Sequence, residues 1–366
     1  FARGASNGLF TVFGSGIPVG SPIAIHTMFG YELKEFPDRG VLIALSRGFK
    51  TNYKDVVLSA RFASVVPENN TLRLLDRFIR GEEETCERLA QSFKQYSVGD
   101  LNFHYRYWKD GDGSLFISGG GSSDITDSDP LGLDLPVIKV EPLDKADDPK
   151  KAGKTAAALN RYLSWAHEQM SVHPLALQRE SKGLPPINFL ITKWCGKRQK
   201  LEPFSKKFGL KAASLPDEEV VAGVVSEMGM NVVNLPRIYD PEQDVRTRLN
   251  KAEEMLQDHD FIHLHTKEPD FTSHWNDPIK TKESLESWDR GFSVYWERLA
   301  KNPNLLTIIT SDHTTPSQWQ NLKPGEFNDQ HSGEPCPIMI RGRHVRVDEV
   351  SEAGERPAAA GSLGLI

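Results

Sequence analysis

Three clusters of aspartate and histidine lie between residues 263 and 331 of this 366-residue chain. The first cluster follows the apolar run 261–264, and the second follows the apolar and β-branched run 305–310. Buried parallel strands are apolar runs of this kind, and sites in α/β folds lie beyond the carboxyl ends of such strands. The pattern therefore predicts that five side chains meet at one edge of a sheet: Asp270, His274, Asp312, His313 and His331.

These five side chains are suited to binding divalent metal ions. Mixed carboxylate and imidazole ligands favour Zn²⁺ or Mn²⁺ over Ca²⁺ or an iron–sulfur centre, and Mg²⁺ is a further candidate. Five ligands exceed what one tetrahedral ion needs, so the sequence predicts two ions, an arrangement common in phosphoryl transfer. The alternative interpretation is that each Asp-His pair only caps a helix or is solvated in a loop.

A candidate nucleophile ends the glycine- and proline-rich loop 14–22. Gly20 lets the backbone approach a ligand closely, which makes the next residue, Ser21, a candidate for covalent catalysis. The alternative is that Ser21 caps a helix with Pro22 at its first position. Both roles stay open, because the N-terminus of a helix also binds anions.

Composition limits the partners and the compartment of the protein. A net charge of −6 does not indicate a nucleic-acid surface, and no apolar run is long enough to span a membrane. Three widely spaced cysteines form no disulfide framework or Cys-x-x-Cys pair, so we expect a reducing, cytoplasmic setting. Because the chain starts at Phe1 rather than Met, we expect that it is the interior of a longer protein. An oligomer is left open.

The predicted type of sheet differs between the two halves of the chain. Strand-like runs at 55–66 and 102–108, with a turn at 110–113, predict an antiparallel sheet, and alanine-rich periodicity predicts a long helix over 148–171. From residue 186, strands at 187–192, 231–234, 261–264 and 305–310 alternate with helices, which predicts a parallel α/β sheet. The segment 119–129 is either a flexible linker or a substrate contact through Asp124, Asp127 and Asp129.

These motifs together resemble a known family. The sequence is similar to the archaeal-type cofactor-independent phosphoglycerate mutases of the alkaline phosphatase superfamily, over nearly the whole chain. A weaker match lies at 361–365. The matching stretches are Gly20-Ser21, Phe29-Gly30-Tyr31, Arg39-Gly40-Val41, Asp127-Ser128-Asp129-Pro130, His173-Pro174 with Arg179, Gly229-Met230, Lys267-Glu268-Pro269-Asp270 to His274, Thr310-Ser311-Asp312-His313 and His331-Ser332-Gly333-Glu334-Pro335.

The resemblance implies an architecture. It implies an alkaline-phosphatase-like, mostly parallel sheet flanked by helices, formed by residues 1–56 and 183–366. A smaller α/β cap that binds the substrate would be inserted at 57–182. A strand with a further Asp ligand would precede Phe1.

The resemblance also implies roles for single residues. Ser21 matches the phosphorylated serine. Asp270, His274 and His331 match the ligands of one metal, and Asp312 and His313 match ligands of the second. Lys193 stands where the family usually has an arginine that contacts phosphate or carboxylate. The cap residues that would hold the glycerate part are Arg61, Asp127, Asp129, His173 and Arg179.

Several departures bear on the reaction. Pro22 follows the serine where some members have Asp, Leu131 stands where His is frequent, and Ala222 stands where a lysine is expected. The segment 318–330 is an insertion between two of the clusters. The expected reaction is the interconversion of 3-phosphoglycerate and 2-phosphoglycerate through a phosphoserine. The alternatives are a metal-dependent phosphomonoester or phosphonate-related hydrolase, and an inactive metal-binding homologue.

Overall fold

The computed structural model describes residues 4–17, 19–79, 81–328 and 330–348. The sequence match at 361–365 lies outside these residues. The chain divides into two compact units. Unit 1 comprises Phe1–Phe36 and Leu201–Ile366, and unit 2 comprises Pro37–Lys200. Among the described residues, no helix combines the length and the apolar character that crossing a membrane requires.

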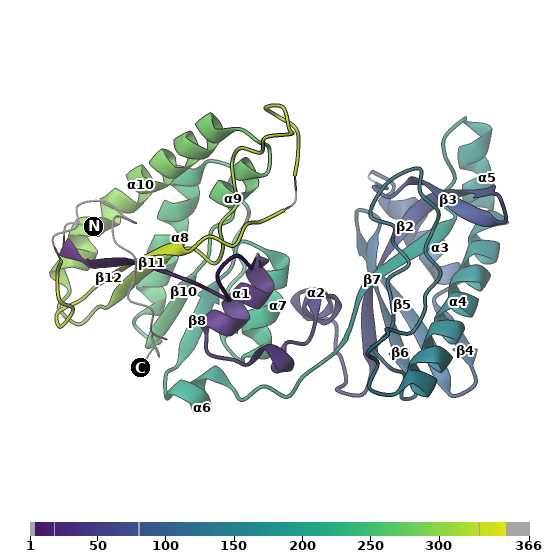
Figure 1. Ribbon diagram of the computed structural model, residues 1–366, viewed down its shortest axis with the longest axis horizontal. Helices are drawn as coiled ribbons and strands as arrows, with labels where there is room; N and C mark the ends of the chain where they lie inside the picture. The colour runs from purple at the N-terminus through teal and green to yellow at the C-terminus, as the bar shows by residue number, and fades with distance from the viewer. Residues whose placement is uncertain (1–3, 18, 80, 329, 349–366) are drawn as a thin grey trace. The chain divides into compact units, whose positions relative to one another are not determined.

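Unit 1 contains two small three-stranded sheets, one parallel and one antiparallel (Figure 1). Strands β10, β8 and β9 lie side by side in parallel, whereas β1, β12 and β11 pair antiparallel. The elements of unit 1 are β1 (Ser6–Phe10), α1 (Ser21–Met28), the 3₁₀ helix η2 (Leu33–Glu35), α6 (Phe204–Phe208), β8 (Ala212–Leu215), α7 (Glu219–Glu227), β9 (Asn231–Val232), α8 (Pro241–Met255), β10 (Phe261–Leu264), α9 (Glu268–Ser273), α10 (Pro278–Lys301), β11 (Thr307–Thr310) and β12 (Cys336–Arg341).

The expected parallel sheet is therefore only partly present. The prediction that the strand at 305–310 joins it is wrong, because β11 pairs antiparallel with β12. The run Cys336–Arg341, which completes that sheet, carried no strand prediction. Strand pairing depends on partners distant in sequence, and a short apolar run does not specify them.

The amphipathic pattern at 246–259 predicts a helix over these residues, and α8 begins five residues earlier, at Pro241. The side chain of Asp240 accepts hydrogen bonds from the amides of Glu242 and Gln243 (2.9 and 3.1 Å), and Pro241 occupies the first turn. A capping aspartate followed by proline is a strong helix start. The cap, rather than the apolar periodicity, sets this boundary.

Unit 2 is built on one six-stranded sheet in which every described strand pair is antiparallel. Its elements are α2 (Arg39–Ser46), β2 (Val56–Glu68), β3 (Thr71–Asp76), α3 (Glu83–Ser92), β4 (Gln95–Val98), β5 (Leu101–Lys109), β6 (Asp112–Ser118), α4 (Pro149–Ser171), α5 (Pro174–Ser181) and β7 (Phe189–Lys197). The predicted antiparallel hairpin at 102–113 and the long helix at 148–171 are confirmed.

Strand β7 corrects the sequence prediction. The run 187–192 was expected in the parallel sheet, but β7 pairs antiparallel with Val56–Ala63 of β2. Helix α4 contacts one side of this region and α2 also packs on β7, so most of its residues are buried. A strand that is buried on both faces has the continuous apolar run expected of a parallel strand, which explains the error.

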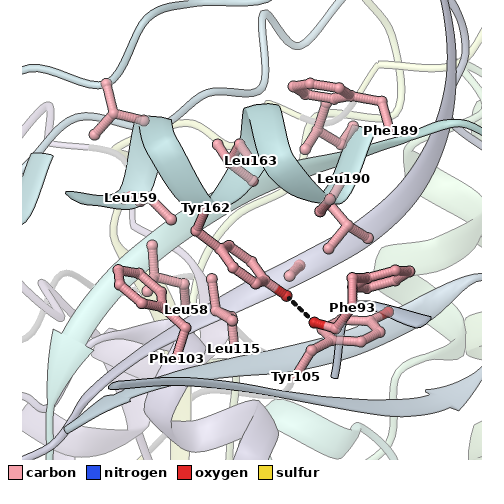
Figure 2. Packing of buried hydrophobic residues seen from close by; sticks show 14 of the residues in the cluster. Leu58, Phe93, Phe103, Tyr105, Leu115, Leu159, Tyr162, Leu163, Phe189 and Leu190 are labelled. Atoms are coloured by element: carbon pink, nitrogen blue, oxygen red, sulfur yellow. Dashed lines mark hydrogen bonds between the residues drawn. The ribbon is translucent and has the colours of Figure 1, made fainter. Parts of the chain in front are cut away.

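The core of unit 2 lies where α4 crosses the sheet (Figure 2). Leu159, Tyr162 and Leu163 of α4 face Leu58 of β2 and Leu115 of β6. The ring of Tyr162 stacks on Phe103, at 5.0 Å between centroids. Its buried hydroxyl donates to the carbonyl oxygen of Phe93 (3.2 Å), so the hydroxyl of Tyr162 is satisfied in the core.

Unit 2 extends beyond the predicted cap segment at both ends. Unit 2 contains all of the segment 57–182 and adds α2 and β7, because both pack on β2. The assignment of catalytic and cap roles to the two parts of the chain stays a prediction at this point.

We expect Gly40→Ala to destabilise unit 2, because a Cβ there would lie 2.2 Å from the carbonyl oxygen of Trp194. Overpacking of this kind costs about 1–3 kcal/mol. Gly153→Ala in α4 is the matched control, since its Cβ would meet nothing within 4 Å. That variant should gain about 0.5–1 kcal/mol from helix propensity. Urea unfolding of both variants checks this, and equal midpoints would contradict it.

Candidate metal centre

Asp270, His274 and His331 form the first group of candidate ligands. Asp270 lies on α9, which begins shortly after β10, and His274 follows four residues later at the end of that helix. The Nε2 atom of His274 is 3.3 Å from Oδ2 of Asp270, and Nε2 of His331 is 3.6 Å from Oδ1. One ligand atom from each residue lies within 4.8 Å of the other two. Two donors of one tetrahedral ion lie about 3.4 Å apart, so this spacing suits a single ion.

Backbone carbonyls fix the direction of both histidines. The Nδ1 atom of His274 is 2.5 Å from the carbonyl oxygen of Asn328, and Nδ1 of His331 is 2.7 Å from that of Val19. A carbonyl oxygen only accepts, so each Nδ1 donates its hydrogen. In the neutral imidazole each Nε2 then presents a lone pair to the carboxylate of Asp270. A cation between these acceptors resolves the conflict, so the residues fit a divalent ion.

Ser21, Asp312 and His313 form the second group. The hydroxyl oxygen of Ser21 lies 3.0 Å from Nε2 of His313, and that nitrogen is 3.6 Å from Oδ2 of Asp312. No hydrogen bond from the described residues reaches this buried Oδ2 atom. An orphaned carboxylate oxygen beside an imidazole nitrogen and a hydroxyl is again a set of acceptors that suits a cation.

The two groups adjoin each other. The rings of His313 and His331 stack, with centroids 3.8 Å apart and planes 19° from parallel. A backbone bridge between Thr314 and Ser332 holds the two loops together, with the amide of Ser332 donating to the carbonyl of Thr314 (3.0 Å). The five candidate ligands and Ser21 therefore lie in one continuous cluster within unit 1.

Ser21 is the first residue of α1, and Gly20 is the N-cap. No side chain caps this helix, so the interpretation of Ser21 as the capping residue is wrong. Its hydroxyl instead points to His313, and the side chain is buried. Proline at the next position suits the first turn of a helix, where an amide hydrogen is not needed.

The electrostatics favour the ligand forms of Asp270 and His331, whereas for His274 burial would lower the pKa but the contact with Asp270 raises it. Burial would raise the pKa of Asp270, but the contact with His274 and the charge of Lys267 hold it well below its usual range. Burial and the neighbouring His313 lower the pKa of His331 to about 4. An ionised carboxylate and a neutral imidazole are the forms that bind metal ions.

Lys267 is a residue of this site to which the sequence assigned no role. Its ammonium lies 2.8 Å from Oδ2 of Asp270 and 3.1 Å from Oε2 of Glu218. Burial would lower its pKa, but the two carboxylates raise it, so it stays charged. The spacing of three residues between Lys267 and Asp270 at a helix start was the signal that could have indicated it.

The predicted insertion at 318–330 belongs to the site. Its Asn328 supplies the carbonyl that orients His274. Asn276, two residues beyond His274, donates to the carbonyl of Leu322 (2.9 Å) and accepts from the amide of Trp319 (2.6 Å). The insertion is therefore anchored to the loop that follows α9, and it holds a candidate ligand in place.

The remaining predicted residues lie in unit 2. Arg61 of β2 forms a two-pronged ion pair with Asp112 (2.6 and 2.8 Å). The buried Asp129 accepts from Arg77 (2.6 Å) and lies 3.8 Å from the ammonium of Lys193. Arg77 was missed, and no motif around it indicates a buried cation.

Asp127, His173 and Arg179 make separate contacts within unit 2. Asp127 accepts from the amide of Trp194 (2.9 Å), which has a left-handed backbone (φ 59°). The Nδ1 atom of His173 accepts from the amide of Leu175 (3.2 Å), and Arg179 pairs with Glu82. These contacts of His173 and Arg179 therefore do not join them to the cluster around Asp129.

Burial shifts two groups of the Asp129 cluster in opposite directions. It lowers the pKa of Lys193 to about 8, and the charges of Arg77 and Arg61 act in the same sense, against the attraction of Asp129. Burial raises the pKa of Asp127 to about 6, in spite of the amide of Trp194. Arg77 and Arg61 repel the ammonium of Lys193 in spite of the carboxylates nearby, so the cluster suits an anion.

Comparison with known proteins identifies the family. The family model described as 2,3-bisphosphoglycerate-independent phosphoglycerate mutase matches residues 2–176. The enzyme of that name numbered 2 from Methanocaldococcus jannaschii is 32% identical over 98% of this chain and 80% of its own length. The one from Methanopyrus kandleri is 30% identical, over 99% of this chain and 84% of its own.

The chain belongs to the 2,3-bisphosphoglycerate-independent phosphoglycerate mutase family. Two solved structures share its fold. A protein of Pyrococcus horikoshii aligns with a TM-score of 0.75 at 23% identity, over 97% of this chain and 81% of its own. The cofactor-independent phosphoglycerate mutase of Thermoplasma acidophilum aligns with a TM-score of 0.62 at 24% identity, over 99% and 85%. The fold of this family member is mixed α/β with several sheets.

We expect His274→Ala and Asp312→Ala each to lower the number of tightly bound divalent ions by about one, because each removes a ligand from a different group. His344→Ala, at an exposed histidine of unit 1, is the control and should bind like the parent. Elemental analysis after dialysis against Mn²⁺ or Zn²⁺ measures this. Unchanged stoichiometry in both ligand variants would overturn the ligand assignment.

We expect Asp127→Asn to stabilise the protein above pH 6. The folded carboxyl keeps its proton up to about pH 6, whereas the unfolded one loses it near about pH 4. Between these values the folded state binds more protons, so the contribution of Asp127 to stability falls as the pH rises. The variant should gain about 2 kcal/mol at pH 7.5 and about nothing at pH 4.

The matched control is Asp129→Asn, two residues away. It breaks the buried ion pair with Arg77 and should cost about 3–5 kcal/mol at pH 7.5. Urea unfolding of the parent and both variants at the two pH values checks these signs. Asp127→Asn that destabilises at pH 7.5 would contradict the effect of burial on this carboxyl.

Proposed function

We propose that the protein interconverts 3-phosphoglycerate and 2-phosphoglycerate without 2,3-bisphosphoglycerate, through a phosphorylated Ser21. The relatives named above carry the mutase name over nearly the whole of this chain. The observation that carries the proposal is the position of the Ser21 hydroxyl, 3.0 Å from His313 inside the Asp/His cluster. A hydroxyl among candidate metal ligands is placed for covalent catalysis.

Each group of ligands has its own part in the proposal. Asp270, His274 and His331 would hold one divalent ion, and Asp312 with His313 would hold a second beside Ser21. When bound, such ions lower the pKa of a serine hydroxyl and neutralise charge on phosphoryl oxygens. We propose Mn²⁺ or Zn²⁺, with Mg²⁺ as the alternative, since the ligands mix carboxylate and imidazole.

The chain itself orients the reacting atoms. Gly20 and the first turn of α1 fix the Ser21 hydroxyl, whose oxygen lies 3.0 Å from Nε2 of His313. The Ser21 oxygen forms a bond to phosphorus while the bond from phosphorus to the substrate oxygen breaks. The phosphoryl group then passes from Ser21 to the other hydroxyl of the retained glycerate, which regenerates the serine. Lys267 supplies a fixed positive charge beside Asp270.

Unit 2 is proposed to bind an anionic part of the substrate. Lys193 and Arg77 share the buried Asp129, and Arg61 raises the local positive potential. Lys193 presents one ammonium where the family usually has a guanidinium, so it binds a carboxylate or phosphate as a point charge. We propose Asp127, His173 and Arg179 as further contacts to the glycerate part.

The domain assignment follows from these roles. We propose that the segments 1–56 and 183–366 supply an alkaline-phosphatase-like catalytic domain and that 57–182 is the inserted cap. The parallel strands β8, β9 and β10 and the ligands that follow β10 support this assignment. A small phosphorylated acid as substrate and three buried free cysteines fit action in the cytoplasm.

The test is an enolase-coupled assay of the metal-loaded protein alongside an assay of free phosphate. We expect 2-phosphoglycerate to form from 3-phosphoglycerate without added bisphosphoglycerate and with little phosphate released. Release of phosphate without 2-phosphoglycerate would instead identify a hydrolase. Neither product would identify a metal-binding homologue without catalysis.

We expect Ser21→Ala to lower turnover by about a thousandfold or more with little change in melting temperature, because it removes the proposed phosphoryl carrier and no cap. Ser226→Ala, at an exposed serine of α7, is the control and should keep full activity. Intact mass after acid quench should show one added phosphoryl group in the parent only. Turnover in Ser21→Ala near that of the parent would overturn the role of Ser21.

A further inference from the structure

We infer that Thr315 is a positioning residue that couples the two groups of candidate metal ligands. Its hydroxyl oxygen contacts Oδ1 of Asp270 in the first group and lies 3.1 Å from Nδ1 of His313 in the second. No part of the sequence pattern assigns a role to this residue. The inference rests on the metal ligands of the proposed function and adds a residue that is not itself a candidate ligand.

The hydrogens available on Thr315 and His313 decide which atom is the donor in each of these two hydrogen bonds. The carboxylate of Asp270 can only accept, so the Thr315 hydroxyl donates to it. The Thr315 oxygen is then left as an acceptor, and Nδ1 of His313 must be the donor. The neutral imidazole of His313 therefore carries its hydrogen on Nδ1.

This hydrogen bond decides whether Nε2 of His313 directs a lone pair or a hydrogen toward Ser21 and Asp312. With the hydrogen on Nδ1, the lone pair of Nε2 faces the hydroxyl of Ser21 (3.0 Å) and Oδ2 of Asp312 (3.6 Å). The other tautomer would place a hydrogen on Nε2 and remove His313 as a ligand. A threonine outside both ligand sets thus selects the form of the imidazole that can bind a metal ion.

The same hydroxyl restrains Asp270. Four other groups already surround this carboxylate. Lys267 lies 2.8 Å and His274 3.3 Å from Oδ2, and His331 lies 3.6 Å and Nδ1 of His313 3.9 Å from Oδ1. The Thr315 hydrogen bond fixes the remaining rotation of the carboxylate. Partners of this kind orient metal ligands, and their loss lowers metal affinity by about 10- to 100-fold.

The loop around Thr315 is built to hold it. The Ser311 hydroxyl donates to the carbonyl of His313 (2.5 Å), and Ser332 donates its amide to the carbonyl of Thr314 (3.0 Å). A β-branched side chain also has few χ1 rotamers, so its hydroxyl is well directed. The backbone that leads into Thr315 is therefore held at His313 and Thr314.

The adjacent threonine offers a matched control. The Thr314 hydroxyl donates to the carbonyl of Glu334 (3.3 Å) and lies 3.8 Å from the sulfur of Cys336, so it contacts no candidate ligand. Thr314→Val and Thr315→Val remove the same atom from neighbouring positions. Thr315→Ser keeps the hydroxyl and serves as the rescue variant.

The experiment is calorimetric titration of the metal-free full chain with Mn²⁺, and with Co²⁺ monitored by visible absorption. We expect Thr315→Val to weaken both binding events by about 10- to 100-fold and to change the Co²⁺ spectrum. Thr315→Ser should restore affinity to within a few-fold, and Thr314→Val should match the parent. Melting temperatures confirm that each variant is folded.

A second measurement does not depend on any variant. The ¹⁵N shifts of histidine in the metal-free parent should show His313 as the tautomer protonated on Nδ1. Protonation on Nε2, normal binding of both ions by Thr315→Val, or weakening of one ion alone would each overturn the coupling. A parent chain that binds no divalent ion would overturn the ligand assignment of the proposed function as well.

Discussion

The carboxylate of Asp270 is the contact on which the rest of unit 1 depends. Lys267, His274, His331 and Thr315 all approach its two oxygen atoms. Burying such a charge is costly unless it is surrounded by partners, and here each partner comes from a different turn or loop. The strand, the short helix and two later loops must therefore all be in place before this carboxylate is satisfied.

The histidines of the cluster are held by groups that carry no chemistry of their own. Carbonyl oxygens of Val19 and Asn328 and the hydroxyl of Thr315 receive the Nδ1 hydrogens of His331, His274 and His313, respectively. Every imidazole thus directs Nε2 inward. The backbone near α1 and the loop after α9 therefore decide the tautomers of these histidines. For this reason a loop insertion can belong to the site.

Unit 2 buries several cations close together, whereas the site in unit 1 is built around a buried carboxylate. Burial, together with repulsion from Arg77 and Arg61, lowers the pKa of Lys193 to about 8 in spite of the nearby Asp129. The antiparallel sheet and α4 supply the rigid support, since the pairing of β2 with β6 and β7 brings residues far apart in sequence to one cluster. A bound anion would relieve this repulsion. The cluster therefore favours anion binding at a cost in the stability of unit 2.

The sequence by itself determined the elements with strong local signals. The turn at 110–113, the helix over 148–171 and the strand at 261–264 followed from turn chemistry and periodicity, which act within a few residues. The sequence also placed Asp270 and His274 in one cluster after the strand at 261–264. Tertiary structure alone decided that β7 joins β2 antiparallel, that β11 joins β12, and that Arg77 meets Asp129. It also decided which nitrogen of each histidine is free. These features depend on hydrogen bonds and ion pairs between residues tens to hundreds of positions apart, and no local pattern of residue types specifies such partners.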